Sequence, residues 1–211
     1  MPSKFSRACM VAAIGAGALF TVASAQANVI QGSLYLVPEA AAQNATPGSV
    51  PAGPADVTFN VGTPLNFTSA GGYTELDFLN SSGATNIVEN TPGTLNHLMD
   101  TGSLGTLLVF SGNVSVTTGQ KFTAGHDDGL TLTIGGLTVI NDPGPTAFQN
   151  TTETYTGPTG NLPFTLVYGE CCGPPAVLAI DLPFTPAPEP ATLAVLGMGL
   201  AGLGFVRRKR A

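Results

Sequence analysis

Short stretches in which Thr, Val, Leu and Phe alternate constrain the fold of this chain more than any other feature. Such alternation, bounded by turn-forming residues, is typical of strands with one buried face. We therefore expect residues 28–187 to form one all-β domain, an antiparallel sandwich or barrel. The stretches are residues 32–37, 56–61, 65–69, 74–80, 105–112, 113–118, 120–125, 129–134, 137–141, 152–157, 163–170 and 176–182, with Gly, Pro and Asn between them.

Two segments of this domain do not follow the strand pattern. Residues 38–45, PEAAAQNA, favour one turn of helix. Residues 45–55, ATPGSVPAGPA, are rich in Pro and Gly and predict a flexible loop. We find no further helix pattern and no internal repeat between residues 28 and 187.

The charges are distributed unevenly along the chain. All 13 acidic residues lie between Glu39 and Glu189, where Lys121 is the only basic residue, so this region carries a net charge of −12. A strongly acidic body repels phosphate backbones and attracts cations. The charge therefore excludes nucleic acid as a partner.

Residues 1–27 have the features of a secretory signal peptide. Lys4 and Arg7 precede an apolar stretch that ends in the small-residue pattern Ala25-Gln26-Ala27. A signal peptide of this kind is removed on export, so we expect the mature chain to begin near Asn28. A buried or membrane-spanning helix is the alternative, but the apolar stretch is short and rich in Gly and Ala.

The chain ends in an uncharged segment followed by a basic cluster. Residues 191–206 predict a transmembrane helix, and the basic cluster would stay on the cytoplasmic side. A plain membrane anchor would explain these two features. With the tripeptide before the helix, residues 188–211 resemble the PEP-CTERM sorting signal, which implies recognition and removal by an exosortase, a membrane transpeptidase of Gram-negative bacteria. The residues that carry the resemblance are Pro188, Glu189, Pro190, Arg207, Arg208, Lys209 and Arg210.

The stretch GLTLTIGGLTVIND, residues 129–142, predicts a β-hairpin. Gly135 and Gly136 can both adopt the positive φ angles of a two-residue turn. If the pairing continues without interruption, Ile134 lies opposite Leu137. Leu132 then lies opposite Val139 on the core face, and Leu130 lies opposite Asn141.

This register places oxygen ligands together at the open end of the hairpin. Asp142 would return beside Gly129, next to Asp127 and Asp128, with the Asn141 amide close by and His126 adjacent. Clustered carboxylates repel unless a cation or protons intervene, and hard oxygen ligands suit Ca²⁺. Asp127, Asp128, Asn141 and Asp142 are therefore candidate Ca²⁺ ligands. The alternative is that the two adjacent aspartates cap a turn.

The segments GHDDGLTLTIGGLTVIND and PFTLVYGE resemble the sugar-binding sandwich first named for anthrax protective antigen. Yeast flocculins, GLEYA adhesins and fibro-slime domains belong to the same group. The resemblance covers about residues 56–183 and implies a jelly-roll-like antiparallel β-sandwich. It also implies that Asp127 and Asp128 hold a Ca²⁺ ion that binds sugar hydroxyls. The inclusion of Asn141 and Asp142 depends on the hairpin register alone.

Cys171 and Cys172 are the only cysteines left after the signal peptide is removed. Adjacent Cα atoms lie about 3.8 Å apart, closer than the roughly 5.5 Å usual for disulfide-bonded cysteines. The pair could form a strained vicinal disulfide, bridges between chains, or two free thiols. We favour the vicinal disulfide, since the mature chain offers no other cysteine and export leads to an oxidising compartment.

The residue types argue against an enzyme. His97 and His126 are the only histidines, and the sequence has no G-x-S-x-G elbow and no zinc-spaced histidine pair. Paired acids such as Asp127 and Glu170 could hydrolyse glycosides only at a suitable separation. A glycoside hydrolase is therefore the least favoured interpretation.

Together these features predict an exported protein of the cell surface or extracellular matrix of a Gram-negative bacterium. We expect a non-catalytic, Ca²⁺-dependent carbohydrate-binding module, with exopolysaccharide or biofilm glycan as its partner. The inner membrane would be contacted transiently through the C-terminal helix. The alternative is a structural matrix protein or a glycosylation scaffold, which would use the sequons NAT, NFT, NSS, NVS and NTT.

Overall fold

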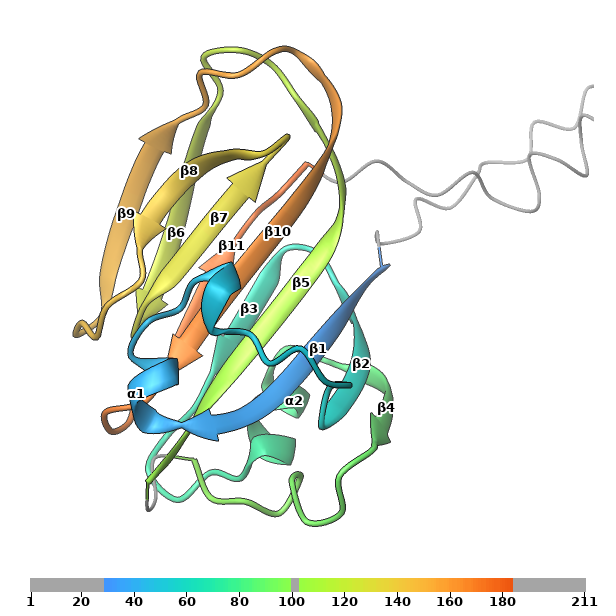
Figure 1. Cartoon of the computed structure of the whole chain (residues 1–211), viewed down its shortest axis with the longest axis vertical. Coiled ribbons are helices and arrows are strands. Elements are labelled where there is room, and N and C mark those ends of the chain that lie inside the picture. The colour runs from blue at the N-terminus through green and yellow to red at the C-terminus, as the bar shows by residue number, and fades with distance from the viewer. Residues whose placement is uncertain (1–28, 100–102, 184–211) are drawn as a thin grey trace, which may run out of the picture.

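The computed structural model describes residues 29–99 and 103–183 (Figure 1). The expected signal peptide, residues 1–27, and the expected sorting tail with its helix at 191–206 lie outside these ranges. In the described ranges, no helix is both long enough and apolar enough to cross a membrane. The elements are β1 (Val29–Pro38), α1 (Glu39–Ala42), η1 (Pro47–Ser49), β2 (Val57–Gly62), β3 (Leu65–Thr68), α2 (Glu75–Ser81), β4 (Thr85–Glu89), β5 (Leu104–Val116), β6 (Lys121–Asp127), β7 (Leu130–Ile134), β8 (Leu137–Asp142), β9 (Gln149–Thr154), β10 (Gly160–Glu170) and β11 (Val177–Ile180).

Two antiparallel sheets make up the domain. One sheet has seven strands in the order β4-β2-β1-β5-β10-β7-β8, and the other has four in the order β3-β11-β6-β9. Every pairing between these strands is antiparallel. The expectation of an all-β, antiparallel domain is therefore confirmed.

The long pair β5–β10 forms the middle of the larger sheet. Its register runs from Val116 opposite Gly160 to Thr106 opposite Glu170. The stretches 105–112 and 113–118, which we expected as separate strands, are one strand because Gly112 and Asn113 continue the ladder opposite β10. This pair leads directly to the residues discussed below, because Glu170 ends β10.

An aromatic cluster fills the space between the two sheets. Phe59 and Phe110 from the larger sheet pack against Phe67 from the smaller one, with ring centroids 5.7 to 6.1 Å apart. Phe78 of α2 packs on Phe67 at 5.4 Å. All four rings are buried. Aromatic pairs in such tilted arrangements stabilise a core beyond the area that they bury, so the two sheets share one hydrophobic core.

A smaller apolar cluster lies on the opposite face of the larger sheet. It contains Val37, Ala42, Ala45, Leu107, Val167 and Cys171. Close packing of α1 on the sheet requires glycine at position 169, where a Cβ atom would lie 2.2 Å from the Ala42 carbonyl oxygen. The predicted helical turn at 38–45 is thus present as α1. The loop at 45–55 contains η1, and its Ala45 N–H donates to the Pro143 carbonyl at 3.0 Å.

Residues 74–80, which we expected to form a strand, instead contain the N-cap and most of helix α2. The Thr74 side chain accepts from the Asp77 N–H, and the Asp77 carboxylate accepts from the Thr74 N–H, which is a capping box. Helix α2 then buries Phe78 and Leu79, which lie three and four residues after Glu75 and so on the same face of the helix. The strand β4, which follows α2, was not expected from the sequence.

The hairpin register is correct at its turn and wrong beyond it. Gly135 and Gly136 have φ angles of 58° and 82°, and Ile134 lies opposite Leu137 as expected. A β-bulge then shifts the pairing, so that Leu132 lies opposite Ile140 and Leu130 opposite Asp142. The core residue of β8 is accordingly the buried Ile140, because the half-buried Val139 is the extra residue of the bulge.

The capping box predicts a pH-dependent contribution of Asp77 to stability. Hydrogen bonds from the Thr74 N–H and hydroxyl lower the pKa of Asp77 below its ordinary 3.8. A group whose pKa is lower in the folded state stabilises the fold above its unfolded pKa, and this stabilisation is lost as the pH falls through the folded pKa. Thermal melts should therefore give a higher melting temperature for wild type than for Asp77→Asn near neutral pH. This gap in melting temperature should close in acid. A gap that stays constant down to the acid limit would contradict this.

Candidate functional site

The segment Asp127-Asp128-Gly129 carries the chain from one sheet to the other. Strand β6 ends at Asp127 in the four-stranded sheet, and β7 begins at Leu130 in the seven-stranded sheet. The peptide bond between the two aspartates is cis. Gly129 is required by a close approach, since a Cβ atom there would lie 2.3 Å from the Pro143 carbonyl oxygen. Both aspartates are therefore held at the end of the sandwich, where the two sheets meet.

The Asp128 carboxylate connects two loops that are far apart in sequence. Its Oδ1 accepts from the Thr146 N–H at 3.0 Å, and its Oδ2 accepts from the Cys171 N–H at 3.0 Å. Only 4% of Asp128 is exposed. Hydrogen bonds to a charged acceptor in such a buried place are shorter and stronger than neutral ones. Asp128 thus fixes the loops on either side of it.

Tyr168 holds the backbone of Asp127 from the core side. The Tyr168 hydroxyl donates to the Asp127 carbonyl and lies 2.9 Å from Glu170 Oε2. Burial of the phenol, and secondly the neighbouring Glu170 carboxylate, raises the pKa of Tyr168 well above its ordinary value. The hydroxyl therefore keeps its proton and remains a donor to the segment that carries the two aspartates.

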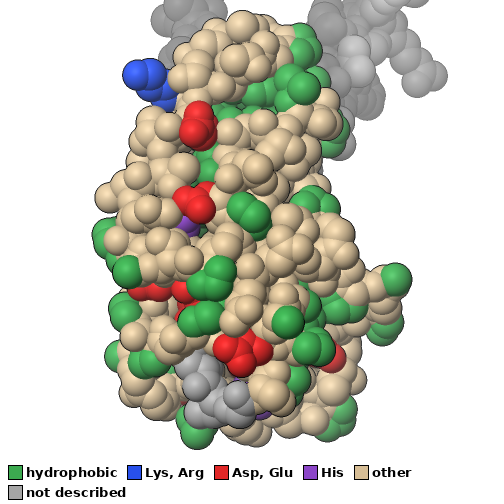
Figure 2. Space-filling view, turned by 60° about the vertical axis from the view of Figure 1, so that its left-hand side comes forward, with side chains coloured by type: hydrophobic (Ala, Val, Ile, Leu, Met, Phe, Trp, Pro, Cys, Tyr) green, Lys and Arg blue, Asp and Glu red, His purple; other side chains and the backbone are tan. Residues whose placement is uncertain are grey.

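An open cleft of about 440 Å³ lies at the two aspartates. Pro145, Thr146 and Ala147 line one side of it, and residues 172–175 line the other. The volume is within the usual range of small-molecule sites, about 300–1,000 Å³. Figure 2 turns the side of the molecule with β6, β8 and β9 toward the viewer and shows acidic side chains spread among mostly uncharged ones. The cleft combines apolar, rigid sides with carboxylates.

Two further acidic side chains, Glu75 and Glu170, are buried behind the two aspartates that line the cleft. Asp127, Asp128, Glu75 and Glu170 are each at most 7% exposed. Glu75 accepts a hydrogen bond from the Thr106 hydroxyl, and Thr106 is the cross-strand partner of Glu170. Buried carboxylates need hydrogen bonds, a cation or protons to offset the loss of hydration.

Lysine and arginine are scarce in the part of the chain that the structure describes. Lys121 is the only lysine or arginine there, and it is exposed at the opposite end of β6 from Asp127. Six residue steps along the strand separate the two by about 20 Å, at roughly 3.3 Å per step. No lysine or arginine of the described residues therefore lies beside the four acids.

Asn141 and Asp142, which we expected at the same site, do not line the cleft. The bulge in β8 pairs Asn141 with Thr131 and leaves it exposed. The Asp142 carboxylate accepts from Gln149 Nε2 at 2.6 Å and from the Thr151 hydroxyl at 3.2 Å. The expected set of ligands is therefore divided, with Asp127 and Asp128 in the cleft and Asn141 and Asp142 outside it.

His126 lies between these two places. Its Nδ1 donates to the Asp128 carbonyl at 2.5 Å, because a carbonyl oxygen can only accept. Its Nε2 lies 2.8 Å from the Thr151 hydroxyl and 3.6 Å from Asp142 Oδ2. The imidazole is fully buried, so it supports the backbone of the site without lining the cleft.

Sequence patterns did not indicate the residues that form the sides of the cleft. Pro174, Pro175 and the Thr146 N–H belong to loops without a recognisable motif. Glu170 was considered only as an acid paired with Asp127, although it ends the apolar stretch FTLVYGE, where an exposed acid would be unexpected. Glu75 was not identified because residues 74–80 were interpreted as a strand.

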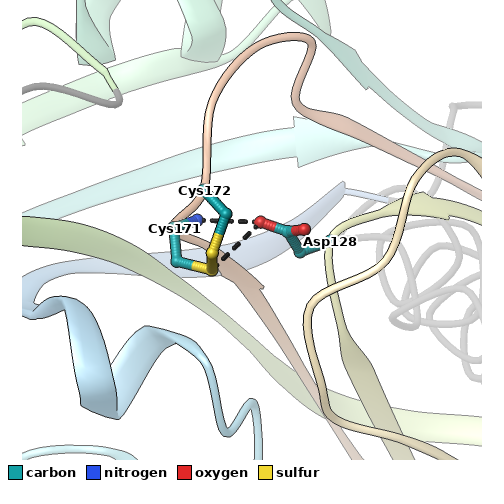
Figure 3. Close-up of side chains that lie close together, drawn as sticks. All are labelled: Asp128, Cys171 and Cys172. Atoms are coloured by element: carbon teal, nitrogen blue, oxygen red, sulfur yellow. Dashed lines mark hydrogen bonds between the residues drawn. A yellow bond between two sulfur atoms is a disulfide. The ribbon is translucent and has the colours of Figure 1, made fainter.

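Cys171 and Cys172 form a disulfide in the structure, with Cα atoms 3.7 Å apart. The bond lies against the acidic site (Figure 3): Cys171 Sγ is 3.2 Å from Asp128 Oδ2, and Cys172 lines the cleft. Asp128 and the two cysteines also form a group with metal-ligand atoms within 4.8 Å of one another. A disulfide sulfur is not the thiolate that binds metals, so the oxidised pair leaves the carboxylates as the ligands.

Comparison with known proteins agrees with both resemblances. Residues 186–210 match the PEP-CTERM protein-sorting motif. No curated protein sequence matches the chain. The fold is similar to the PA14 sugar-binding domain from an RTX adhesin, with a TM-score of 0.50 and 19% identity, over 74% of this chain and 95% of that one. The PA14 domain of the antifreeze protein MpAFP matches with a TM-score of 0.46 and 15% identity, over 76% and 91%.

The sorting motif is thus confirmed, and the match to the RTX adhesin domain supports the expected β-sandwich fold. The chain thus carries a PEP-CTERM motif, which implies export to the surface or the extracellular space. Its body has the fold of PA14 sugar-binding domains. At this level of identity the likeness to solved structures is one of fold.

The disulfide predicts a specific mass and behaviour on gels. The oxidised chain should be a monomer about two mass units lighter than the dithiol, since each cysteine loses one hydrogen. Intact-mass measurement before and after reduction checks this on protein purified without a reductant. Dimers that disappear on reduction would show bridges between chains instead, and titratable free thiols in the untreated protein would contradict both arrangements.

Proposed function

We propose that this protein is a non-catalytic carbohydrate-binding module that holds glycan through Ca²⁺ at Asp127 and Asp128. In this proposal an exosortase removes the PEP-CTERM tail, and the mature module remains at the cell surface or in the exopolysaccharide of a biofilm. The observation that carries the proposal is the pair of buried aspartates in an open cleft, with two further buried acids behind them.

The donor set of the cleft fits calcium. Ca²⁺ takes about six to eight oxygen ligands at roughly 2.3–2.6 Å, in flexible geometry. Each carboxylate has about four lone-pair positions, and the two backbone N–H groups at Asp128 occupy only part of them. Asp127 and Asp128 would hold the ion. A calcium ion held by few protein ligands supplies open positions at which vicinal hydroxyl groups of a sugar can replace water.

The sides of the cleft suit the remaining surface of a sugar. Pro145, Ala147, Pro174 and Pro175 present rigid apolar surfaces toward the aspartates. The C–H groups of a pyranose ring can pack on such surfaces, while its hydroxyls face the carboxylates and the ion. Prolines lose little conformational freedom on binding, so this arrangement can contribute to affinity without an aromatic platform in the lining.

A glycosylation scaffold is the second candidate, and one observation favours it. The asparagines of the five sequons, Asn44, Asn66, Asn80, Asn113 and Asn150, are all exposed. Attached sugars could therefore be accommodated without unfolding. A panel of polysaccharides, tested with and without Ca²⁺, separates the two functions. The module should retain specific glycans only with the ion, whereas a scaffold should retain none in either condition.

The ends of the mature polypeptide test directly whether an exosortase removes the tail. The mature polypeptide from the native host should begin near Asn28 and end close to Pro188–Pro190. Intact-mass measurement decides this, and a Glu189→Ala variant should keep the tail because the tripeptide is altered. A wild-type species that still contains residues 207–210 would contradict exosortase processing and leave a simple membrane anchor.

Calcium should raise the melting temperature of the wild-type domain. A ligand that binds only the folded state stabilises it by RT ln(1 + [L]/Kd), which is about 2.7 kcal/mol at 100 times Kd. The double variant Asp127→Asn/Asp128→Asn should barely respond. Glu153→Gln, which alters an exposed acid on β9, should respond like wild type.

Mg²⁺ should substitute poorly for Ca²⁺ in the same melts, because it demands tighter octahedral geometry and retains its waters. If millimolar calcium leaves the wild-type melting temperature unchanged, the aspartates serve only to fix the loops. The calcium part of the proposed function would then be wrong.

A further inference from the structure

We propose that the thiol state of Cys171 and Cys172 controls the affinity of the cleft for calcium. The oxidised pair leaves Asp128 available to the ion, and reduction by a dithiol weakens binding. This inference rests on the proposed calcium site. It concerns a chemical modification of that site by a reductant, which the proposed function does not require.

The disulfide contacts the carboxylate that lies at the centre of the site. Both the N–H and the Sγ of Cys171 point at Asp128 Oδ2, at 3.0 and 3.2 Å (Figure 3). Cys172 lies on the cleft side, where Gln43 Nε2 donates to its Sγ at 3.6 Å. A reductant can reach the bond through the exposed Cys172, while Cys171 is only 6% exposed. The bond therefore links the open cleft to the buried carboxylate.

Reduction should leave the rest of the fold in place. The loop-closure contribution of a disulfide grows with the number of residues that it encloses, and this bond encloses none. The Cys171 side chain also packs in the small apolar cluster with Ala42, Ala45 and Val167, which holds it in position without the bond. The consequences of reduction are therefore local to the cleft.

The change at Asp128 follows from the hydrogen atoms that reduction adds. A dithiol supplies two electrons and two protons, the S–S bond breaks, and the reductant closes to a cyclic disulfide. Each cysteine sulfur then carries one hydrogen. A disulfide sulfur has no proton to donate, but the Cys171 thiol can donate to Asp128 Oδ2 from its present place. That hydrogen bond occupies a lone pair that would otherwise bind the cation.

Calorimetric titration of the full chain with CaCl₂ tests this in both thiol states. The reduced state is prepared with dithiothreitol without oxygen, and a chromogenic disulfide reagent counts its thiols. We expect calcium to bind about tenfold more weakly to the reduced chain, the effect of one hydrogen bond to a charged group. Equal, measurable affinity in the two states overturns this inference and leaves the proposed function standing. No binding in either state overturns both.

Two matched variants test the role of the donor. Cys171→Ser/Cys172→Ser keeps a hydroxyl donor beside Asp128, and Cys171→Ala/Cys172→Ala removes it. The serine pair should bind calcium as weakly as the reduced wild type, and the alanine pair should bind like the oxidised chain. An alanine pair as weak as the serine pair overturns the donor mechanism.

The reduction midpoint of the disulfide, measured on the wild type with and without calcium, gives a further test. Coupling between two equilibria is reciprocal, so saturating calcium must make the disulfide harder to reduce by the same factor. A tenfold coupling corresponds to a shift of about 30 mV in the two-electron reduction midpoint, toward more negative potential. An unchanged midpoint with calcium present, in protein that binds calcium when oxidised, overturns the inference.

Discussion

The two hydrogen bonds of the Asp128 carboxylate determine the geometry of the whole site. They join Thr146, in the loop after β8, to Cys171, which follows β10 and is 43 residues away from Asp128. Without this carboxylate, both N–H groups would lose their acceptor, and the cost of an unsatisfied buried donor is about 1–3 kcal/mol. The cleft is therefore open and rigid because one side chain holds both of its sides.

The same residue has a structural task and is the best candidate for a ligand. The two tasks are compatible because a carboxylate has more lone-pair positions than the two N–H groups use. The residues around Asp128 hold the backbone of the two aspartates in place. Tyr168 anchors the Asp127 carbonyl, Glu170 lies against Tyr168, and His126 holds the Asp128 carbonyl. A cation would complete a network in which acidic groups outnumber basic ones, so binding and folding stability should be linked.

Local patterns predicted those parts of the structure that depend on local chemistry. The Gly135-Gly136 turn was predictable because only glycine adopts two successive positive φ angles readily. The bulge was not, since Val139 and Ile140 are both apolar and either could face the core. The expected register lacked this one-residue shift. It therefore placed Asn141 and Asp142 opposite the wrong residues of β7, and neighbouring strand residues point to opposite faces.

Sequence patterns could not predict helix α2 or the cleft, and the physical cause differs between the two. The stretch TELDFLN alternates like a strand, but the capping box at Thr74 and the burial of Phe78 favoured a helix. The sides of the cleft come from loops that meet only after both sheets have formed. Asp127 and Asp128 could be predicted because they are adjacent in sequence, whereas their partners at Thr146 and Cys171 depend on long-range packing.

The central claim is that Asp127 and Asp128 hold a calcium ion in the cleft. Diffraction from crystals of the mature chain grown with calcium, with the anomalous signal recorded, tests it most directly. We predict an anomalous peak about 2.3–2.6 Å from carboxylate oxygens of both aspartates, with further oxygen ligands from water or sugar in the cleft. A cleft without a peak at saturating calcium, in which Asp128 contacts only Thr146 and Cys171, would contradict the account.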